Sequence, residues 1–224
     1  MNNKIIVEEN KYIEVLEGYV FANGGDGTLL YAINKFKHLK KPFYGKASGT
    51  VNYLMNKEDK PIEGSFVKSF SLIKATVYYM EDNLNKEIVV EAFNDIMIGG
   101  NMNSWINFKI EDKDELFGEF FGGGIIFSTP QGSTGINKNN NGSILPLSSN
   151  LWSITGDKTE RKIEYVVEPR QITVIAKSRT NVTLWCDGIN HVIDNVQKVV
   201  LESGGTVEVI FNNFKEFQQK RRKI

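Results

Sequence analysis

The sequence contains few of the residues that build metal centres and disulfide frameworks. Cys186 is the single cysteine, and His38 and His191 are the only histidines. One cysteine excludes an intrachain disulfide and a multi-cysteine zinc site, and two histidines exclude a three-histidine metal site. No metal-ligating residue is therefore assigned. Cys186 alternates with Leu184 along an apolar stretch and is interpreted as a small core residue.

The chain also lacks an excess of charge of either sign and a long apolar run. Lys and Arg number 27, Asp and Glu number 27, and the formal net charge is zero. Because nucleic acids and anionic membrane surfaces attract basic proteins, neither is expected as a partner. No run of about 20 apolar residues would span a membrane. The first residues lack the basic start and apolar run of a signal peptide. A soluble cytoplasmic protein is predicted.

The 224 residues, 41% of them hydrophobic, are enough for one large or two small domains. Residues 1–60 read as α/β, with short apolar runs at 5–7, 18–22 and 43–44 that suit buried strands. Apolar residues from Leu29 to Leu39 recur at helical spacings. Beyond residue 62 the period is two, and turn signals stand at 82–83, 99–100, 139–142, 168–169, 187–188 and 204–205.

This pattern predicts a fold of the class α/β plus all-β. A small Rossmann-like α/β domain (1–60) is followed by an antiparallel β-sandwich-like domain (61–211). The tail 212–224 is expected to pack back on the first domain, with its basic end, residues 218–224, exposed to solvent.

The strongest local signal is the Asn-Gly-Gly-Asp-Gly-Thr segment at residues 23–28, between an apolar strand and a helix. The glycines let the backbone approach a ligand closely, and the first N–H groups of the helix attract phosphate. Asp26 would repel phosphate unless a metal or a substrate hydroxyl lay between them, which indicates a working carboxylate. The alternative is an Asp-Gly turn in which Asp26 or Thr28 caps the helix. The segment is neither a Walker nor a dinucleotide fingerprint.

Two further polar segments interrupt apolar strands. Residues 127–135, Phe-Ser-Thr-Pro-Gln-Gly-Ser-Thr-Gly, form a hydroxyl-rich loop suited to ribose, phosphate or amide groups, or else a plain turn. Asn94 and Asp95 lie within the apolar stretch 88–98. Polar groups in a buried strand need partners, so these two either meet the hydroxyls of a ligand or mark a bulge or strand end.

The order Gly-Gly-Asp-Gly-Thr, Asn-acidic pair, Ser-Thr-Pro-x-Gly-Ser-Thr resembles the NAD kinase family. Residues 45–54 are similar to the second glycine loop of that family and residues 185–188 to its late Asp-Gly turn, so the resemblance covers about residues 17–215. It implies Mg²⁺-dependent transfer of the γ-phosphate of ATP, or of a phosphate from polyphosphate, to the adenosine ribose 2′-hydroxyl of NAD. A homo-oligomer, dimer or tetramer, is implied as well.

The resemblance also implies roles for individual residues. Asp26 would be the general base that accepts the proton of the hydroxyl. Gly24, Gly25, Gly27 and Thr28 would contact the phosphates. Asn94, Asp95 and Tyr53 would contact the ribose and the base. The dinucleotide pocket would be lined by Thr129, Ser133, Thr134, Gly135 and Ile136.

The sequence departs from the family pattern at several positions. Gly123 stands where the family has an acid, Ile136 where it has an aromatic residue, and Asn52 where it has a glycine. The Pro-His and Arg-Pro pattern is not recognisable at 154–161. These departures leave open a catalytically weak or inactive relative that binds NAD-like nucleotides. A third hypothesis, a lipid kinase of the diacylglycerol type, rests on the Gly-Thr-Val-Asn segment at residues 49–52.

Overall fold

The computed structural model describes residues 4–8, 11–48, 52–101, 104–112, 116–188 and 191–221. The chain divides into two compact units. Unit 1 is Met1–Phe70 with Thr206–Ile224, and unit 2 is Ser71–Gly205. Two long strands, β5 (Phe66–Glu81) and β16 (Val196–Phe211), belong to both units. No helix within the described ranges is long and apolar enough to cross a membrane.

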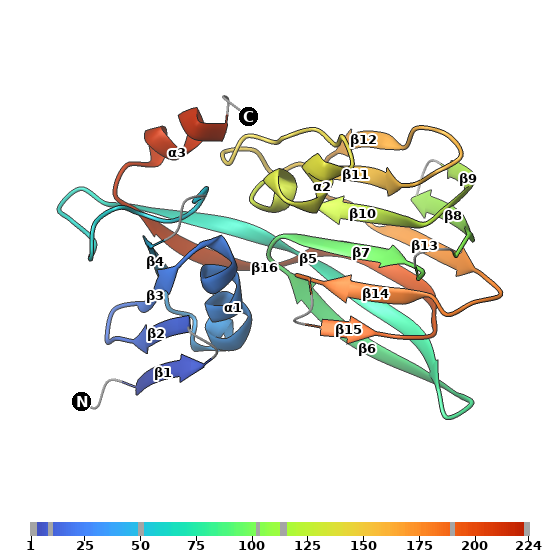
Figure 1. Ribbon diagram of the computed structural model, residues 1–224, viewed down its shortest axis with the longest axis horizontal. Helices are drawn as coiled ribbons and strands as arrows, with labels where there is room; N and C mark the ends of the chain where they lie inside the picture. The colour runs from blue at the N-terminus through green and yellow to red at the C-terminus, as the bar shows by residue number, and fades with distance from the viewer. Residues whose placement is uncertain are drawn as a thin grey trace. The chain divides into compact units, whose positions relative to one another are not determined.

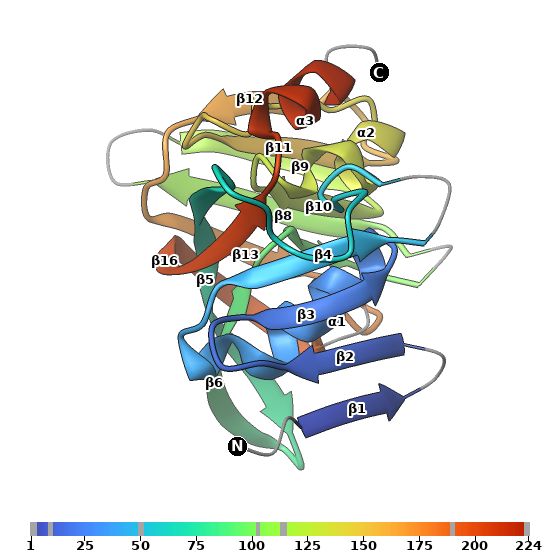
Figure 2. The same cartoon turned by 90° about the vertical axis from the view of Figure 1, so that its left-hand side faces the viewer.

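Unit 1 is a small sheet covered by one helix. The strand order is β1-β2-β3-β4, continued by the end of β16, where Val209 pairs with Phe43. β3 and β4 are parallel, and β1, β2 and β3 are antiparallel (Figure 2). The helix α1 contacts β2, β3 and β4 and buries Leu29, Ile33 and Phe36. The elements are β1 (Lys4–Glu8), β2 (Lys11–Val15), β3 (Val20–Gly24), α1 (Asp26–Phe36), a 3₁₀ turn (Lys37–Leu39), β4 (Phe43–Ala47) and α3 (Phe214–Arg221).

Unit 2 consists of two antiparallel layers (Figure 1). One contains the hairpin β5-β6 and the order β16-β13-β8-β9, and the other has the order β12-β11-β10-β7-β14-β15. The remaining elements are β6 (Leu84–Ala92), β7 (Asp95–Gly99), β8 (Ile106–Asp112), β9 (Leu116–Gly122), β10 (Gly124–Ser128), a 3₁₀ turn (Gly132–Thr134), α2 (Ile136–Asn139), β11 (Trp152–Asp157), β12 (Glu164–Val167), β13 (Ile172–Lys177), β14 (Thr183–Cys186) and β15 (His191–Ile193).

The core of unit 2 lies between its two sheets. One sheet contributes residues such as Phe108, Val174 and Leu201, and the other contributes residues such as Ile125 and Trp152, all nearly inaccessible to water. Apolar side chains at alternate positions of each strand face this layer, because successive side chains of a strand point to opposite faces. Cys186 is part of the core, as its spacing predicts.

The predicted fold class is confirmed: a mixed α/β sheet precedes an antiparallel β-sandwich. The predicted domain boundaries stood after residues 60 and 211. The compact units change over after Phe70 and Gly205, within β5 and β16.

The sequence left open whether Asn94 and Asp95 meet a ligand or mark a bulge or strand end. Asn94 lies at a strand end, because the stretch 88–98 is two strands in different sheets, β6 and β7. One local prediction is wrong: Gly204 and Gly205 lie within β16 rather than in a turn. The Glu91 carboxylate accepts a hydrogen bond from the Gly205 N–H (2.8 Å), and a Cβ on Gly204 would lie 2.9 Å from Glu91 Oε1. These glycines therefore make room for a neighbouring side chain.

The basic end of the chain, residues 218–224, was predicted to be exposed to solvent, and its described part, residues 218–221, differs from this prediction. Residues 214–221 form α3, and Arg221 is only 4% exposed. Phe217 of α3 packs on Phe211 with ring centroids 4.8 Å apart. The predicted glycine loop at 45–54 falls partly outside the described residues, which omit 49–51.

Candidate functional site

The Gly-Gly-Asp-Gly-Thr segment forms a tight turn between β3 and α1. The helix begins at Asp26 after Gly25, whose backbone is extended. A Cβ on Gly24 would lie 2.2 Å from Thr28 Oγ1, so a side chain at position 24 would displace Thr28. The N–H groups of Asp26 and Gly27 precede the first bond of the helix, in which Thr28 N–H donates to the Gly25 carbonyl at 2.9 Å. They lie at the positive end of α1, which favours an anion.

The Asp26 carboxylate is held by two successive backbone amides of a different segment. Tyr53 N–H donates to Oδ2 at 2.8 Å and Leu54 N–H donates to Oδ1 at 2.9 Å. No side chain caps α1, so the interpretation of Asp26 or Thr28 as a helix cap is wrong. Each carboxylate oxygen can accept a second hydrogen bond, and this capacity suits the carboxylate for contact with a ligand.

Two cations act on this carboxylate. Burial raises the pKa of Asp26 above its ordinary value, while the amides of Tyr53 and Leu54 and the charges of Arg221 and Lys220 oppose the rise. Burial lowers the pKa of Arg221 to about 10, against the attraction of Asp26. Sequence reasoning assigned no site role to Arg221, since its only signal was a basic cluster near the end of the chain.

In unit 2, the corner between β6 and β7 is fixed by Asp187. Its carboxylate, 2% exposed, accepts hydrogen bonds from the N–H groups of Phe93 (2.9 Å), Asn94 (2.7 Å) and Asp95 (3.2 Å). The Asp187 N–H donates to the Asp95 carbonyl at 3.0 Å. The Asp-Gly turn at 187–188 was visible in the sequence, but the partner of its carboxylate was not.

The same corner presents two polar side chains from neighbouring positions. The Asn94 Oδ1 atom is buried and has no hydrogen-bond partner among the described residues. Burial, with the nearby charge of Asp187, raises the pKa of Asp95 to about 7. Buried groups of this kind either need partners or mark functional sites.

The Ser-Thr-Pro loop packs directly on this corner. Thr129 Oγ1 donates to the Phe93 carbonyl (2.7 Å), and Thr129 N–H donates to the Asn94 carbonyl (2.9 Å). A Cβ on Gly132 would lie 2.2 Å from the Asn94 carbonyl oxygen. Only glycine permits this approach, so the loop and the Asn-Asp corner form one cluster.

The members of this loop differ in exposure. Thr129 and Ser133 are fully buried, and Ser133 Oγ donates to the Pro130 carbonyl (2.9 Å) and accepts from Leu145 N–H (2.9 Å). Their hydroxyls hold the loop in shape. Thr134, Gly135 and Ile136 retain exposed surface. Within this loop, Thr134, Gly135 and Ile136 are therefore the residues that remain accessible to a ligand.

A carboxylate lies beside Gly123, the position at which the NAD kinase pattern of the sequence analysis has an acidic residue. A Cβ on Gly123 would lie 3.3 Å from Asp157 Oδ2, and Gly123 N–H donates to the Asp157 carbonyl at 2.9 Å. Asp157, Lys158 and Trp105, which is 61% exposed, line a small hollow of about 250 Å³ next to Gly123. Asp157 thus places a carboxylate close to position 123.

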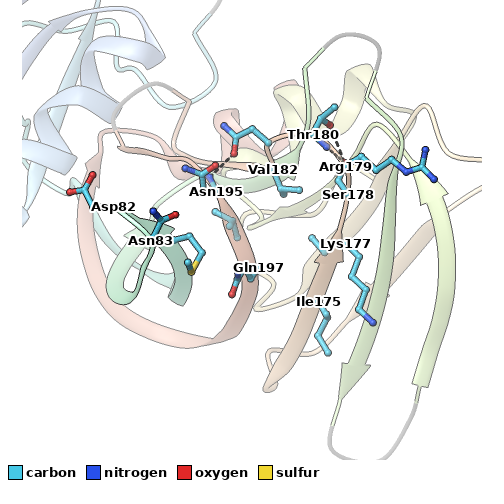
Figure 3. Close-up of a pocket in the computed structure, with 14 residues that line it drawn as sticks. Asp82, Asn83, Ile175, Lys177, Ser178, Arg179, Thr180, Val182, Asn195 and Gln197 are labelled. Carbon is cyan, nitrogen blue, oxygen red and sulfur yellow. Dashed lines mark hydrogen bonds between the residues drawn. The ribbon is translucent and has the colours of Figure 1, made fainter.

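A larger hollow of about 810 Å³ lies elsewhere in unit 2. Figure 3 places Asp82 and Asn83 on one side of it and Lys177, Ser178 and Thr180 on the other. None of the predicted site residues lines it. This hollow is therefore separate from the predicted site.

The predicted site residues form two groups, one in each unit. Asp26 and its glycines join Tyr53 in unit 1, and the Asn-Asp corner joins the Ser-Thr-Pro loop in unit 2. Across the described part of the chain, no group of three or more His, Cys, Asp or Glu side chains could hold a metal ion.

The fold is similar to that of two solved kinases. An NAD kinase from Archaeoglobus fulgidus, solved in complex with ATP, superposes with a TM-score of 0.73 and 21% identity over 92% of this chain and 84% of that one. Yeast NADH kinase, solved with NADH, gives a TM-score of 0.77 and 17% identity over 92% of this chain and 64% of that one. At these identities the likeness shows the fold alone.

Sequence comparison identifies the family. The NAD kinase of Rickettsia africae (strain ESF-5) is 33% identical over 158 residues, which are 67% of this chain and 62% of that protein. The NAD kinase of Rickettsia prowazekii (strain Madrid E) is 32% identical over the same share. No family model matches the sequence. The chain belongs to the NAD kinase family, and the match spans less than two thirds of the length of these relatives.

Proposed function

We propose that the protein is an NAD kinase that transfers the γ-phosphoryl group of ATP to the adenosine ribose 2′-hydroxyl of NAD, giving NADP and ADP. The observation that carries this proposal is the carboxylate of Asp26, held by two backbone amides beside a helix N-terminus. The family relatives named NAD kinase support the choice of substrates.

In the proposed reaction, Asp26 accepts the proton of the 2′-hydroxyl as that oxygen bonds to the γ-phosphorus. The bond between the γ-phosphorus and the β,γ-bridging oxygen breaks, and ADP leaves with the electron pair. Most of the catalysis is then positioning and charge stabilisation. The turn at Gly24, Gly25, Gly27 and Thr28 supports a phosphate role, because it joins close backbone approach to a helix N-terminus.

Recognition of the nucleoside is proposed for unit 2. The unpartnered Asn94 oxygen suits a hydroxyl or amino donor, and Asp95 suits ribose hydroxyls. Thr134, Gly135 and Ile136 retain accessible surface in the neighbouring loop, and Tyr53 is proposed to pack near a base. Mg²⁺ would enter with ATP, as part of that substrate, and offset phosphate charge. Its requirement, the oligomeric state and the cytoplasmic location stay predictions.

A weakly active or inactive nucleotide-binding relative is the second candidate. Gly123 and Ile136 favour it, since a carboxylate and an aromatic ring of the family pattern are missing there. The carboxylate of Asp157 beside Gly123 argues against it. Retention of Asp26 in an ordered hydrogen-bonded position argues against it as well.

The test is an assay of NADP after incubation with ATP, Mg²⁺ and NAD, with Asp26→Asn as the control. NADP formation well above this control is expected. Parallel reactions with NADH, with polyphosphate and with diacylglycerol identify the acceptor and donor. Formation of no NADP above the Asp26→Asn level would refute the kinase, and phosphorylation of diacylglycerol alone would support the lipid kinase hypothesis.

A further inference from the structure

The helix α3 presents one buried face to unit 1. Phe217 and Arg221, four residues apart on the same side of the helix, are both nearly inaccessible to water. A buried guanidinium is costly unless a negative charge compensates it. Asp26 is the carboxylate whose charge acts on Arg221, and the hydroxyl of Tyr53 acts on it too. The packing of α3 therefore buries a cation whose charge acts on the proposed general base.

The same helix contacts the segment that orients this base. Lys220 Nζ donates to the Asn52 carbonyl at 3.4 Å, one residue before the amides that bond to Asp26. One turn earlier on the helix, Glu216 forms an ion pair with Lys57 at 2.6 Å. Contacts at both ends of residues 52–57 thus join this segment to α3.

We propose that α3 is part of the reaction centre, in which Arg221, with Lys220 beside it, is a positioning residue that keeps the Asp26 carboxylate charged and oriented to accept a hydroxyl proton. This role rests on the proposed function. Arg221 need not touch the substrate, because it acts through Asp26. Within the described ranges, the ionisable groups that act on Asp26 are Arg221 and Lys220, and the direction of their effect is the same.

The test titrates Asp26 by NMR in protein labelled at aspartate carboxyl carbons, with Asp26→Asn assigning the signal. Arg221→Met keeps the apolar stem and removes the charge, Arg221→Lys keeps the charge, and Lys215→Gln removes an exposed charge from the same helix. Arg221→Met is expected to raise the pKa of Asp26, whereas Arg221→Lys restores most of the effect and Lys215→Gln changes nothing. An unchanged Asp26 titration in Arg221→Met would overturn the proposal.

Kinetics provide the second readout. In Arg221→Met the acid limb of the pH profile for kcat moves to higher pH, so kcat falls by a larger factor at pH 6.5 than at pH 8.5. A uniform loss at all pH values would contradict a role in keeping Asp26 charged. The titration needs no substrate, so an absence of NADP formation by the unaltered protein would refute the proposed function while the titration still decides this inference.

Should Arg221→Met fail to fold, Lys220→Met removes the second cation at a half-buried position. A rise in the pKa of Asp26 in that variant supports the proposal, and an unchanged titration overturns it.

Discussion

Asp95→Asn tests the electrostatics of the Asn-Asp corner most directly. The substitution removes the charge of Asp95 with almost no change in shape, while Asp187 keeps its hydrogen bonds to the three backbone amides of the corner. At pH 8 the unaltered protein holds two carboxylates close together in a poorly hydrated place. The variant holds one, so it is expected to be more stable at that pH.

The magnitude follows from the pKa of Asp95, raised from 3.8 to about 7 by burial and by Asp187. Each pH unit between the unfolded and folded values corresponds to about 1.4 kcal/mol. Because the folded state binds the proton more tightly, the stability contributed by protonated Asp95 is complete below pH 3.8. It is lost as the pH rises through 7. Asp95→Asn should therefore raise the free energy of unfolding by about 2–4 kcal/mol at pH 8.

The assay is urea unfolding followed by tryptophan fluorescence at pH 4, 6 and 8. All three tryptophans lie in unit 2, so the signal reports the unit that contains Asp95. The advantage of Asp95→Asn should shrink steadily towards pH 4. Asp82→Asn, in the exposed turn between β5 and β6, is the matched control and should show no such trend. A variant that is equally or less stable than the unaltered protein at pH 8 would refute the reasoning.

The remaining predictions concern two glycines of unit 2. Gly132→Ala should destabilise the protein by about 1–3 kcal/mol and weaken nucleotide binding, because the added Cβ meets the Asn94 carbonyl. The control is Gly25→Ala in unit 1. Its added Cβ meets open space, so it should cost little stability in the same unfolding assay. Gly123→Asp should not increase NADP formation and should lower stability more at low salt than at high salt, since it sets a second carboxylate beside Asp157. A salt-independent effect would contradict the second prediction.

The parts of the fold that the sequence predicted are those with local causes. The β3–α1 turn is set by consecutive glycines and by helical spacing from Leu29 onwards, and both lie within one short segment. The sequence could not decide between a ligand contact and a strand end at Asn94, because the corner there is fixed by Asp187, which is distant in sequence. Likewise, the pair Gly204-Gly205 is typical of a turn. Its role in making room for the Glu91 side chain of β6 cannot be predicted, because Glu91 is distant in sequence.

The candidate site divides in the same way. Asp26, Asn94 and Asp95 were found because each breaks a local pattern with a polar residue. Arg221 and Asp187 were not, because a basic residue near a chain end and an Asp-Gly turn have common surface explanations. Only the packing of α3 and the folding of the β6–β7 corner place them beside the predicted residues.

The backbone amides that hold Asp26 depend on residues from widely separated parts of the chain. Asn56 donates to the Ile210 carbonyl (2.9 Å) and accepts from Asn212 N–H (2.9 Å), so the segment after Tyr53 is completed by the end of β16. Unit 2 is continuous in sequence, whereas unit 1 needs residues 206–221. During synthesis, unit 2 can therefore fold while unit 1 is still incomplete, and the proposed catalytic carboxylate acquires its environment last.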